Sequence, residues 1–355
     1  MTICYFGNYD PTYSRNRILM KGLTMNGVEV LECNDRSRGL LKYVRLLKKH
    51  WKIRNRYHVM IVGFPGHQAM VLARLLTRKP IIFDAFLSLY DSLVFDRGLY
   101  KPGGLSARYY KLLDKISCRL ADAVLLDTQA HISYFNRVLG LPIAKFKKIF
   151  VGADDEVFYP QKKEKRFTVH FHGKFIPLQG VEYIVRAAEI LKDRGVVFNI
   201  LGKGQTYPVI SQMVKDLNLK NINFIEPVPY YMLPEYILQA DVCLGIFGKT
   251  DKAKRVIPNK VFECAAMKKP IITGESPAVK ELFADRESVL FVRMADAQDL
   301  ADKILELKAD SALRQKLAEG AYRTFVASAT PVLLGRKLKE IIQEITRTHG
   351  TVDSR

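Results

Sequence analysis

The stretch RVIPNKVFECAAMKKPIITG, residues 255–274, places a carboxylate, Glu263, inside an apolar segment that reads as a helix followed by a strand. Pro258 suits the first turn of a helix, where its missing N–H group costs nothing. The free N–H groups and the positive dipole end of such a start attract phosphate. A carboxylate one turn further on can instead accept hydrogen bonds from vicinal hydroxyls. The stretch therefore predicts a bound diphosphate whose ribose contacts Glu263. A charge that only compensates the helix dipole is the alternative.

Short apolar segments alternate with helical patterns on both sides of this stretch. Near-continuous apolar strands are typical of a parallel sheet that is covered on both faces. Their repeated alternation with helices indicates doubly wound sheets. The predicted strands are 2–7, 27–33, 58–64, 80–86, 123–128, 167–173, 196–202, 222–227, 240–247, 269–274 and 288–292. The predicted helices include 15–27, 67–78, 106–121, 181–195, 206–218, 233–240 and 260–268.

The alternation pauses once, in the polar stretch VGADDEVFYPQKKEKR at 151–166, which is the best linker in the chain. A chain of 355 residues suits two domains of this class. The expected division is an N-terminal Rossmann-like domain, 1–160, a C-terminal Rossmann-like domain, 161–330, and a terminal helix and tail, 331–355. The terminal segment has apolar residues at helical spacing, which are Leu334, Leu338, Ile341, Ile342 and Ile345.

The composition, 48% hydrophobic and 26% charged, is typical of a globular protein. No apolar run approaches the roughly 20 residues of a membrane span. The N-terminal MTICYFGNYD lacks the pattern of a signal peptide and is expected to form the first strand. The five cysteines show no metal-ligand spacing and are expected to be buried, reduced thiols, as in a cytoplasmic protein.

The net charge is +20, and residues 36–58 carry nine basic side chains and no acidic one. This surplus suits a polyanion, whether nucleic acid, an acidic membrane surface or a phosphate-bearing substrate; a solvated face is the alternative. Within it, Leu40, Val44, Leu47 and Trp51 recur along one helical face. A basic helix with such a face can lie in a membrane interface, or the face can be turned toward the core.

Glycines and lysines follow two of the predicted strands in the second half of the chain. Ligands of parallel sheets bind at the carboxyl ends of the strands, where glycine lets backbone N–H groups approach an anion and lysine adds charge. Plain tight turns are the alternative. The residues concerned are His172, Gly173 and Lys174 after one strand and Gly202, Lys203 and Gly204 after the other.

Five blocks of the sequence resemble successive blocks of the retaining glycosyltransferases of family 4, over about residues 150–325. They are VGADDEVFYP, HGKFIPLQGVEYIVRAAEIL, FNILGKGQ, LPEYILQADVCLGIF and PNKVFECAAMKKPIITG. The resemblance implies the GT-B fold, with two Rossmann-like domains facing a central cleft and a C-terminal helix that crosses back to the N-terminal domain. It also implies sugar transfer from a nucleotide-sugar with retained configuration, and neither a cofactor nor a required metal.

Carried over by position, the resemblance implies that Lys174 neutralises the diphosphate leaving group and that Glu263 binds the ribose. The sequence departs from the family at Arg255, where a glutamate is usual, and at Gln179, where a lysine is usual. Asn259 and Lys260 match a subset of the family with PxK before the remaining glutamate. We favour Lys260 as the source of the missing charge; Lys203 and Arg15 are the alternatives.

Further residues follow from the same comparison. The stretch Glu226–Pro229, with Pro227 and Val228, lies where the family grips the base. In the N-terminal half, Gly7 and Asn8 could approach the donor. Asp84 lies near the place of a family histidine and could orient the acceptor hydroxyl or accept its proton, or it could be a buried hydrogen-bonding residue. His67 is the rival candidate for this role.

These observations predict a glycosyltransferase at the cytoplasmic face of a membrane that moves a sugar, with a UDP-sugar favoured as donor, to a glycan or lipid-linked acceptor in polysaccharide assembly. A nucleotide-sugar epimerase on the same fold is one alternative. A non-catalytic polyanion-binding protein is another, although no nucleic-acid module is recognisable and no nucleic acid partner is expected.

Overall fold

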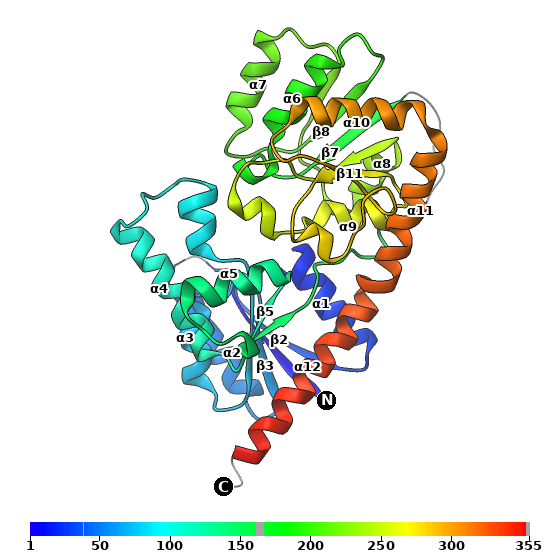
Figure 1. Cartoon of the computed structure of the whole chain (residues 1–355). Coiled ribbons are helices and arrows are strands. Elements are labelled where there is room, and N and C mark those ends of the chain that lie inside the picture. The colour runs from blue at the N-terminus through cyan, green and yellow to red at the C-terminus, as the bar shows by residue number, and fades with distance from the viewer. Residues whose placement is uncertain (38, 161–166, 353–355) are drawn as a thin grey trace. The chain divides into compact units, whose positions relative to one another are not determined.

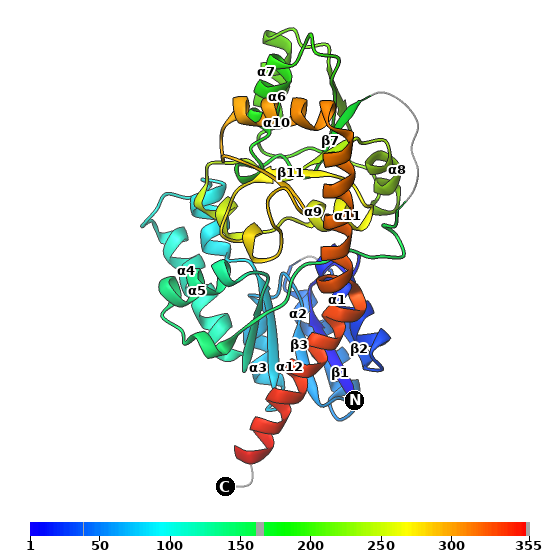
Figure 2. The same cartoon turned by 45° about the vertical axis from the view of Figure 1, so that its right-hand side comes forward.

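The computed structural model describes residues 1–37, 39–160 and 167–352. The chain divides into two compact units, one of 1–152 with 330–355 and one of 153–329. Each unit has a six-stranded parallel sheet, in the orders β2-β1-β3-β4-β5-β6 and β12-β11-β10-β7-β8-β9. Helices are distributed over both faces of each sheet (Figures 1 and 2). The predicted pair of doubly wound sheets is confirmed.

The first unit contains the first half of the elements and the terminal helix. Its strands are β1 (Thr2–Gly7), β2 (Glu29–Asn34), β3 (Val59–Val62), β4 (Ile81–Phe86), β5 (Ala123–Leu126) and β6 (Phe146–Lys148). Its helices are α1 (Ser14–Met25), α2 (Leu41–Ile53), α3 (Ala69–Leu76), α4 (Leu105–Leu120), α5 (Gln129–Leu139) and α12 (Pro331–Val352), with the short helices η1 (Asp91–Asp96) and η2 (Ile143–Lys145).

The second unit contains the remaining elements. Its strands are β7 (Thr168–His172), β8 (Val197–Leu201), β9 (Ile222–Ile225), β10 (Val242–Leu244), β11 (Ile271–Gly274) and β12 (Leu290–Val292). Its helices are α6 (Val181–Ile190), α7 (Tyr207–Asp216), α8 (Leu233–Leu238), α9 (Asn259–Ala266), α10 (Ala297–Ala309) and α11 (Ser311–Ser328), with η3 (Pro177–Gln179), η4 (Tyr230–Met232), η5 (Asp251–Arg255) and η6 (Val279–Glu281).

The linker stretch predicted at 151–166 is described only in part, because 161–166 lie outside the described residues. Phe158 is buried and stacks edge-on against Tyr230, with ring centroids 4.9 Å apart. This contact makes the residues around Phe158 part of the second unit.

The terminal helix α12 packs along α1 within the first unit, as the sequence predicts (Figure 2). Its apolar residues from Leu334 to Ile345 are buried in one cluster with Ile18 and Leu23 of α1. The two backbones touch at Gly22 and Gly335, since a Cβ on Gly22 would lie 2.9 Å from the Gly335 Cα. Neither position has room for a side chain.

The variant Gly335→Ala is therefore expected to destabilise the protein by about 1–3 kcal/mol, because the added methyl overlaps the Gly22 backbone. Alanine has a higher helix propensity than glycine. A loss of stability in this variant is therefore due to the steric overlap. Urea unfolding measures it, with Arg336→Ala on the exposed side of α12 as the control. Equal stability of both variants would contradict the close approach.

The apolar face that the sequence predicts along α2 does not pack on the core. Val44, Leu47 and Trp51 are 46–65% exposed. A neighbouring face packs on the sheet instead, with Leu46 and His50 buried. The alternative in which the predicted face points toward the core is therefore wrong. Arg38, within the predicted basic segment, lies outside the described residues.

The cysteines are all buried and free, as the sequence predicts. Across the described residues, no helix is long and apolar enough to cross a membrane.

Candidate active site

Strand β7 divides its side chains between the two faces of the second sheet. Val169 and Phe171 enter the main core of the unit. His170 and His172 alternate with them, so they point to the opposite face. There His172 meets Glu263 of α9. The alternation of one strand thus places two imidazoles against the helix that the sequence singled out.

A chain of hydrogen bonds joins these side chains. The His172 Nε2 is 2.8 Å from the Glu263 Oε2, and the His170 Nε2 is 3.0 Å from the His172 Nδ1. His170 is buried, which lowers its pKa well below the usual value, so its ring is neutral. One assignment satisfies both contacts: each Nε2–H donates, and the unpartnered His170 Nδ1 carries no proton. The chain therefore fixes the orientation of the Glu263 carboxylate.

Lys260 lies beside these hydrogen-bonded side chains, one helical turn before Glu263, and is only 4% exposed. Its ammonium donates to the Gln179 Oε1 and lies 3.9 Å from the centroid of the Phe171 ring. Burial lowers the pKa of Lys260 to about 7, although nearby Cys264 and Glu263 act in the opposite direction. Lys260 and Gln179, which the sequence linked through the departure at 179, are thus in direct contact.

The turns after β7 and β8 interlock at the carboxyl end of the sheet. A Cβ on Gly173 would lie 3.1 Å from the Lys260 Nζ, and one on Gly202 would overlap the Gly173 carbonyl. Both glycines have positive φ, of 150° and 140°. Glycine is therefore required here by close packing, and at Gly173 this packing brings an ammonium to the strand end.

The exposed lysines of these turns differ in their partners. Lys174 is exposed and forms no ion pair with any described residue. The Lys203 Nζ is 2.7 Å from the Glu226 Oε2, and this contact raises the pKa of Lys203. Glu226, Pro227 and Val228 follow β9 at the same sheet edge. Of the two exposed lysines in these turns, Lys174 is thus the one without an ion-pair partner among the described residues.

The start of α9 differs slightly from the prediction. Pro258 is the N-cap residue with an extended backbone, and the helix begins at Asn259. Asn259 is half-buried, next to the buried Lys260. The helix start nevertheless lies at the carboxyl edge of the sheet, together with Gly173, because Lys260 contacts that glycine.

In the first unit, Gly7 ends β1 and Asn8 follows it. Asn8 and His67 line a cavity of about 230 Å³, together with Lys42. Burial lowers the pKa of His67 to about 3, so the ring is neutral, with its Nε2 3.4 Å from the Asp114 Oδ1. The structure places the rival candidate His67 at a cavity.

Asp84 and Arg15 have a different placement from the predicted one. Asp84 lies inside β4, and both residues are fully buried. The Arg15 Nη2 is 2.9 Å from the Asp84 Oδ1, and the Arg15 Nη1 donates to the carbonyls of Ile149 and Phe150. Arg15 and Asp84 thus neutralise each other's charge in the core and form hydrogen bonds with each other. The alternative of a buried hydrogen-bonding aspartate describes this arrangement, and Arg15 has no free charge for a donor.

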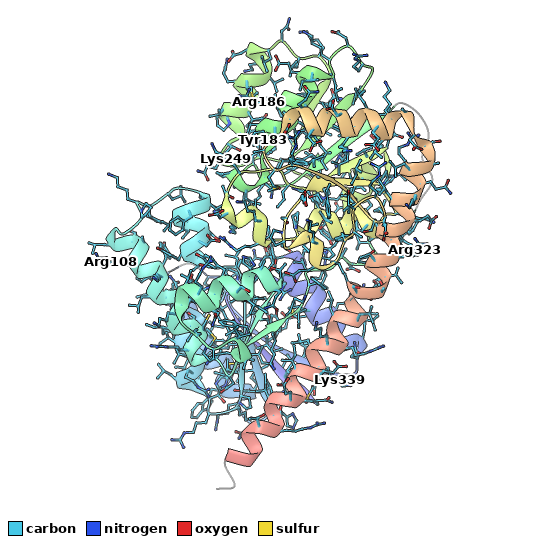
Figure 3. All side chains as sticks on the ribbon, viewed as in Figure 1. Arg108, Tyr183, Arg186, Lys249, Arg323 and Lys339 are labelled. Atoms are coloured by element: carbon cyan, nitrogen blue, oxygen red, sulfur yellow. The ribbon has the colours of Figure 1, made fainter. Side chains whose placement is uncertain are left out.

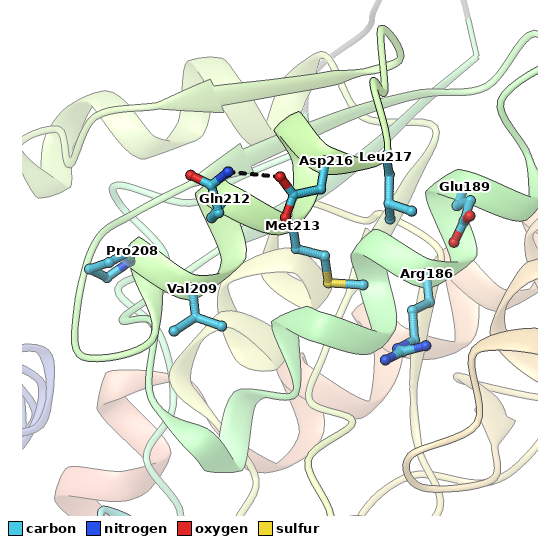
Figure 4. A pocket seen from close by; sticks show the side chains of 8 residues that line it. All are labelled: Arg186, Glu189, Pro208, Val209, Gln212, Met213, Asp216 and Leu217. Atoms are coloured by element: carbon cyan, nitrogen blue, oxygen red, sulfur yellow. Dashed lines mark hydrogen bonds between the residues drawn. The ribbon is translucent and has the colours of Figure 1, made fainter.

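A separate groove of about 690 Å³ lies between α6 and α7 (Figure 4). Its polar lining is partly paired, since the Gln212 Nε2 donates to the Asp216 Oδ1 over 2.7 Å. It shares no residue with the turns after β7 and β8.

The sequence analysis predicted His172 as part of the turn after β7 but did not predict its contact with Glu263. It did not identify His170. The signal was the alternation in TVHFHG, which puts both imidazoles on one face of a strand. Within 1–37, 39–160 and 167–352, no group of three or more His, Cys, Asp or Glu side chains could hold a metal.

Comparison with known proteins gives a consistent class. Residues 153–324 match the family model described as glycosyl transferases group 1. The alpha-D-kanosaminyltransferase of Streptomyces kanamyceticus is 24% identical over 274 residues, which cover 73% of this chain and 68% of that protein. Sucrose-phosphate synthase from Thermosynechococcus elongatus has a TM-score of 0.78 at 13% identity, with 98% of this chain and 100% of that chain covered.

A second solved structure, Anabaena Alr3699/HepE in complex with UDP-glucose, has a TM-score of 0.73 at 14% identity and covers 97% of this chain and 100% of that one. Together with the two doubly wound sheets, these likenesses define a GT-B fold. The match over residues 153–324 and the likeness to a named glycosyltransferase support a transferase enzyme. More particularly, its second unit carries the group 1 domain, and these matches do not favour an epimerase.

Proposed function

We propose that the protein is a retaining glycosyltransferase that uses a nucleotide-sugar, with UDP as the favoured nucleotide, and transfers the sugar to a glycan or lipid-linked acceptor. The observation that carries the proposal is the convergence of Lys260, Glu263 and the start of α9 at the carboxyl edge of the second sheet. A buried ammonium beside an oriented carboxylate suits a diphosphate joined to a ribose.

The electrostatics of this edge support cleavage of the bond between sugar and diphosphate. That cleavage adds negative charge to the diphosphate as the electron pair of the broken bond stays on its oxygen, and preorganised positive groups stabilise such a developing charge. Lys174, Lys260 and the N–H groups at the start of α9 supply them. The transition state is oxocarbenium-like, and the residues of this edge act without a cofactor or metal. The Anabaena structures with UDP and UDP-glucose support the choice of nucleotide.

Ligand binding tests the proposal first. Thermal shift against UDP, GDP, ADP and their sugars should raise the Tm with one uridine compound, since a ligand at ~100 times its Kd adds ~2.7 kcal/mol to the stability. A shift with guanosine or adenosine compounds alone would change the base, and no shift with any would contradict the donor class. Product analysis of the anomeric configuration then tests retention.

The variant Lys174→Ala is expected to lower kcat by about 10²–10³, because it removes a charge that acts on the leaving diphosphate. Donor KM should change less. Lys203→Ala is the matched control, since Lys203 lies at the same edge but is paired with Glu226. Steady-state kinetics of both folded variants separates the roles. An unchanged kcat in Lys174→Ala would remove this residue from the proposed mechanism.

The charge of the chain and the absence of a spanning helix among the described residues fit an enzyme that works at the cytoplasmic face of a membrane. We therefore also propose that the enzyme works at this membrane face on a lipid-linked or envelope acceptor.

A further inference from the structure

Two helices of the first unit expose apolar rows of the same spacing. On α2 the row is Leu40, Val44, Leu47 and Trp51, exposed by 46–80%. On α4 it is Leu105, Tyr109, Leu112 and Ile116, exposed by 37–85%. Both rows step by four, three and four residues, which keeps the side chains on one side of a helix. Single exposed apolar side chains are ordinary, but two matched rows are not.

Both helices also have a second face that packs on the core, so the exposed rows are not their only apolar faces. On α4, Ala107, Ser117 and Cys118 are buried, and Cys118 joins the same cluster as Leu46 of α2. Each helix therefore has two faces, one packed on the sheet and one unpartnered. The exposed rows therefore contribute little to the core, apart from local contacts such as that of Arg54 with the Trp51 ring.

The helices α2 and α4 cover the same face of the sheet. Both contribute to the cluster that lies opposite the one formed with α1 and α12. Helix α3 contacts both of them and itself exposes Val71 and Leu75. Helices α2, α3 and α4 thus form one layer, and each of them carries exposed apolar side chains. We call the rows on α2, α3 and α4 the apolar face.

The exposed charges that α2, α3 and α4 themselves carry are of one sign. No acidic residue occurs between Arg36 and Phe83, a range that includes all of α2 and α3, and the one acidic residue of α4, Asp114, is fully buried. The basic residues Arg108, Lys111 and Lys115 precede the last three residues of the α4 row by one position each. Arg108 points away from the helix layer (Figure 3). Long basic side chains beside apolar ones are typical of interfacial helices.

We propose that the apolar face docks on an anionic lipid bilayer, with the rows of α2 and α4 both inserted and their basic residues in the headgroups. This deepens the proposed location at a membrane, and it rests on no choice of donor or acceptor. A second copy of the chain does not suit the face, because two surfaces of the same positive charge repel. A dissolved polyanion does not suit the face either, because it offers no apolar phase and the rows would stay exposed to water.

Trp51 is the single tryptophan and reports on α2 directly. Vesicles that contain phosphatidylglycerol should shift its fluorescence to the blue, and neutral phosphatidylcholine vesicles should shift it far less. In the variant Trp51→Phe with Leu112→Trp, the single tryptophan moves to α4 and should show the same shift and be quenched by brominated lipid. A shift at 51 without one at 112 would overturn the joint insertion.

Flotation with the same vesicles measures the affinity. The combined variant Arg108→Gln, Lys111→Gln and Lys115→Gln should lose about fivefold in partition coefficient for each charge, and Leu105→Ser with Leu112→Ser about tenfold or more. Val209→Ser, at a 72% exposed position of α7, is the control and should bind as the parent does. Equal binding of all variants, or equal affinity for neutral vesicles, overturns the proposal.

Two further outcomes would also overturn it. One is dimerisation in gel filtration that the α4 variants abolish, without vesicle binding. The other is binding of random-sequence DNA in place of vesicles. The thermal shift with nucleotides, measured without vesicles, tests the proposed function separately, since the variants of the apolar face should leave it unchanged.

Discussion

Replacing Lys260 with methionine is expected to weaken nucleoside diphosphate binding by about 10- to 100-fold, the effect of losing a charged hydrogen bond, and to make the fold more stable below pH 7. Both effects have one cause. The ammonium is almost fully buried, and burial lowers its pKa to about 7. A charge kept in such surroundings costs stability, and the proposed diphosphate would supply the negative charge that Gln179 and Phe171 do not.

The pH dependence follows from the same shift. In the unfolded chain Lys260 keeps its proton up to about pH 10.4, whereas the folded chain releases it near pH 7. Between these values the unfolded state binds the extra proton, so this residue makes the free energy of unfolding rise with pH. Methionine removes the dependence. Its advantage should be greatest below pH 7 and should vanish as the pH approaches 10.4, which Tm measured against pH will show.

Lys269→Met is the matched control, because Lys269 is also buried in the second unit but donates to the carbonyls of Leu238 and Ala240. It should lower stability and leave diphosphate binding intact. Calorimetry at pH 8 in buffers of different ionisation enthalpy should show uptake of close to one proton on binding to the parent and none in Lys260→Met. Unchanged affinity in Lys260→Met would refute its role at the diphosphate.

Local patterns were enough to predict most of the fold. Apolar runs that alternate with helical periods are properties of short segments, and both sheets follow from them. Strand β6 was missed because its three residues, Phe146, Lys147 and Lys148, include two lysines and no apolar run. Its pairing with β5 is a tertiary effect, which local composition does not contain.

Helix α2 shows a second limit. Its sequence has two apolar faces offset by one residue, one with Leu46 and one with Leu47. Periodicity finds both, but only the position of the sheet decides which is covered. The exposed row of α4 was not predicted from the sequence for the same reason.

Contacts between distant residues set the third limit, and they matter most for the site. Arg15 and Asp84 are 69 positions apart and were predicted separately, yet they neutralise each other in the core. His172 and Glu263 are 91 positions apart. The sequence could place Glu263 on a helix start, but the side chain that orients its carboxylate required the structure.

Replacing Glu263 with alanine is expected to raise the donor KM by about 10- to 100-fold with a smaller effect on kcat, because hydrogen bonds from ribose hydroxyls to a charged acceptor contribute about 1.5–3 kcal/mol each. The reason lies in how the carboxylate is held. His172 engages Oε2, and no described residue donates to Oε1. The oriented group thus has one oxygen for a ligand.

A change in affinity alone would also follow from a damaged site, since Glu263 is 3% exposed and bonded to His172. Calorimetry with UDP and with its 2′-deoxy analogue separates the two causes. The parent should prefer the ribose compound by about tenfold, and Glu263→Ala should bind both equally. The variant His172→Ala keeps the carboxylate but not its orientation, so it should retain part of the preference. If Glu263→Ala weakened both compounds equally and kept the preference, Glu263 would be a structural partner of His172 and the ribose would be bound elsewhere.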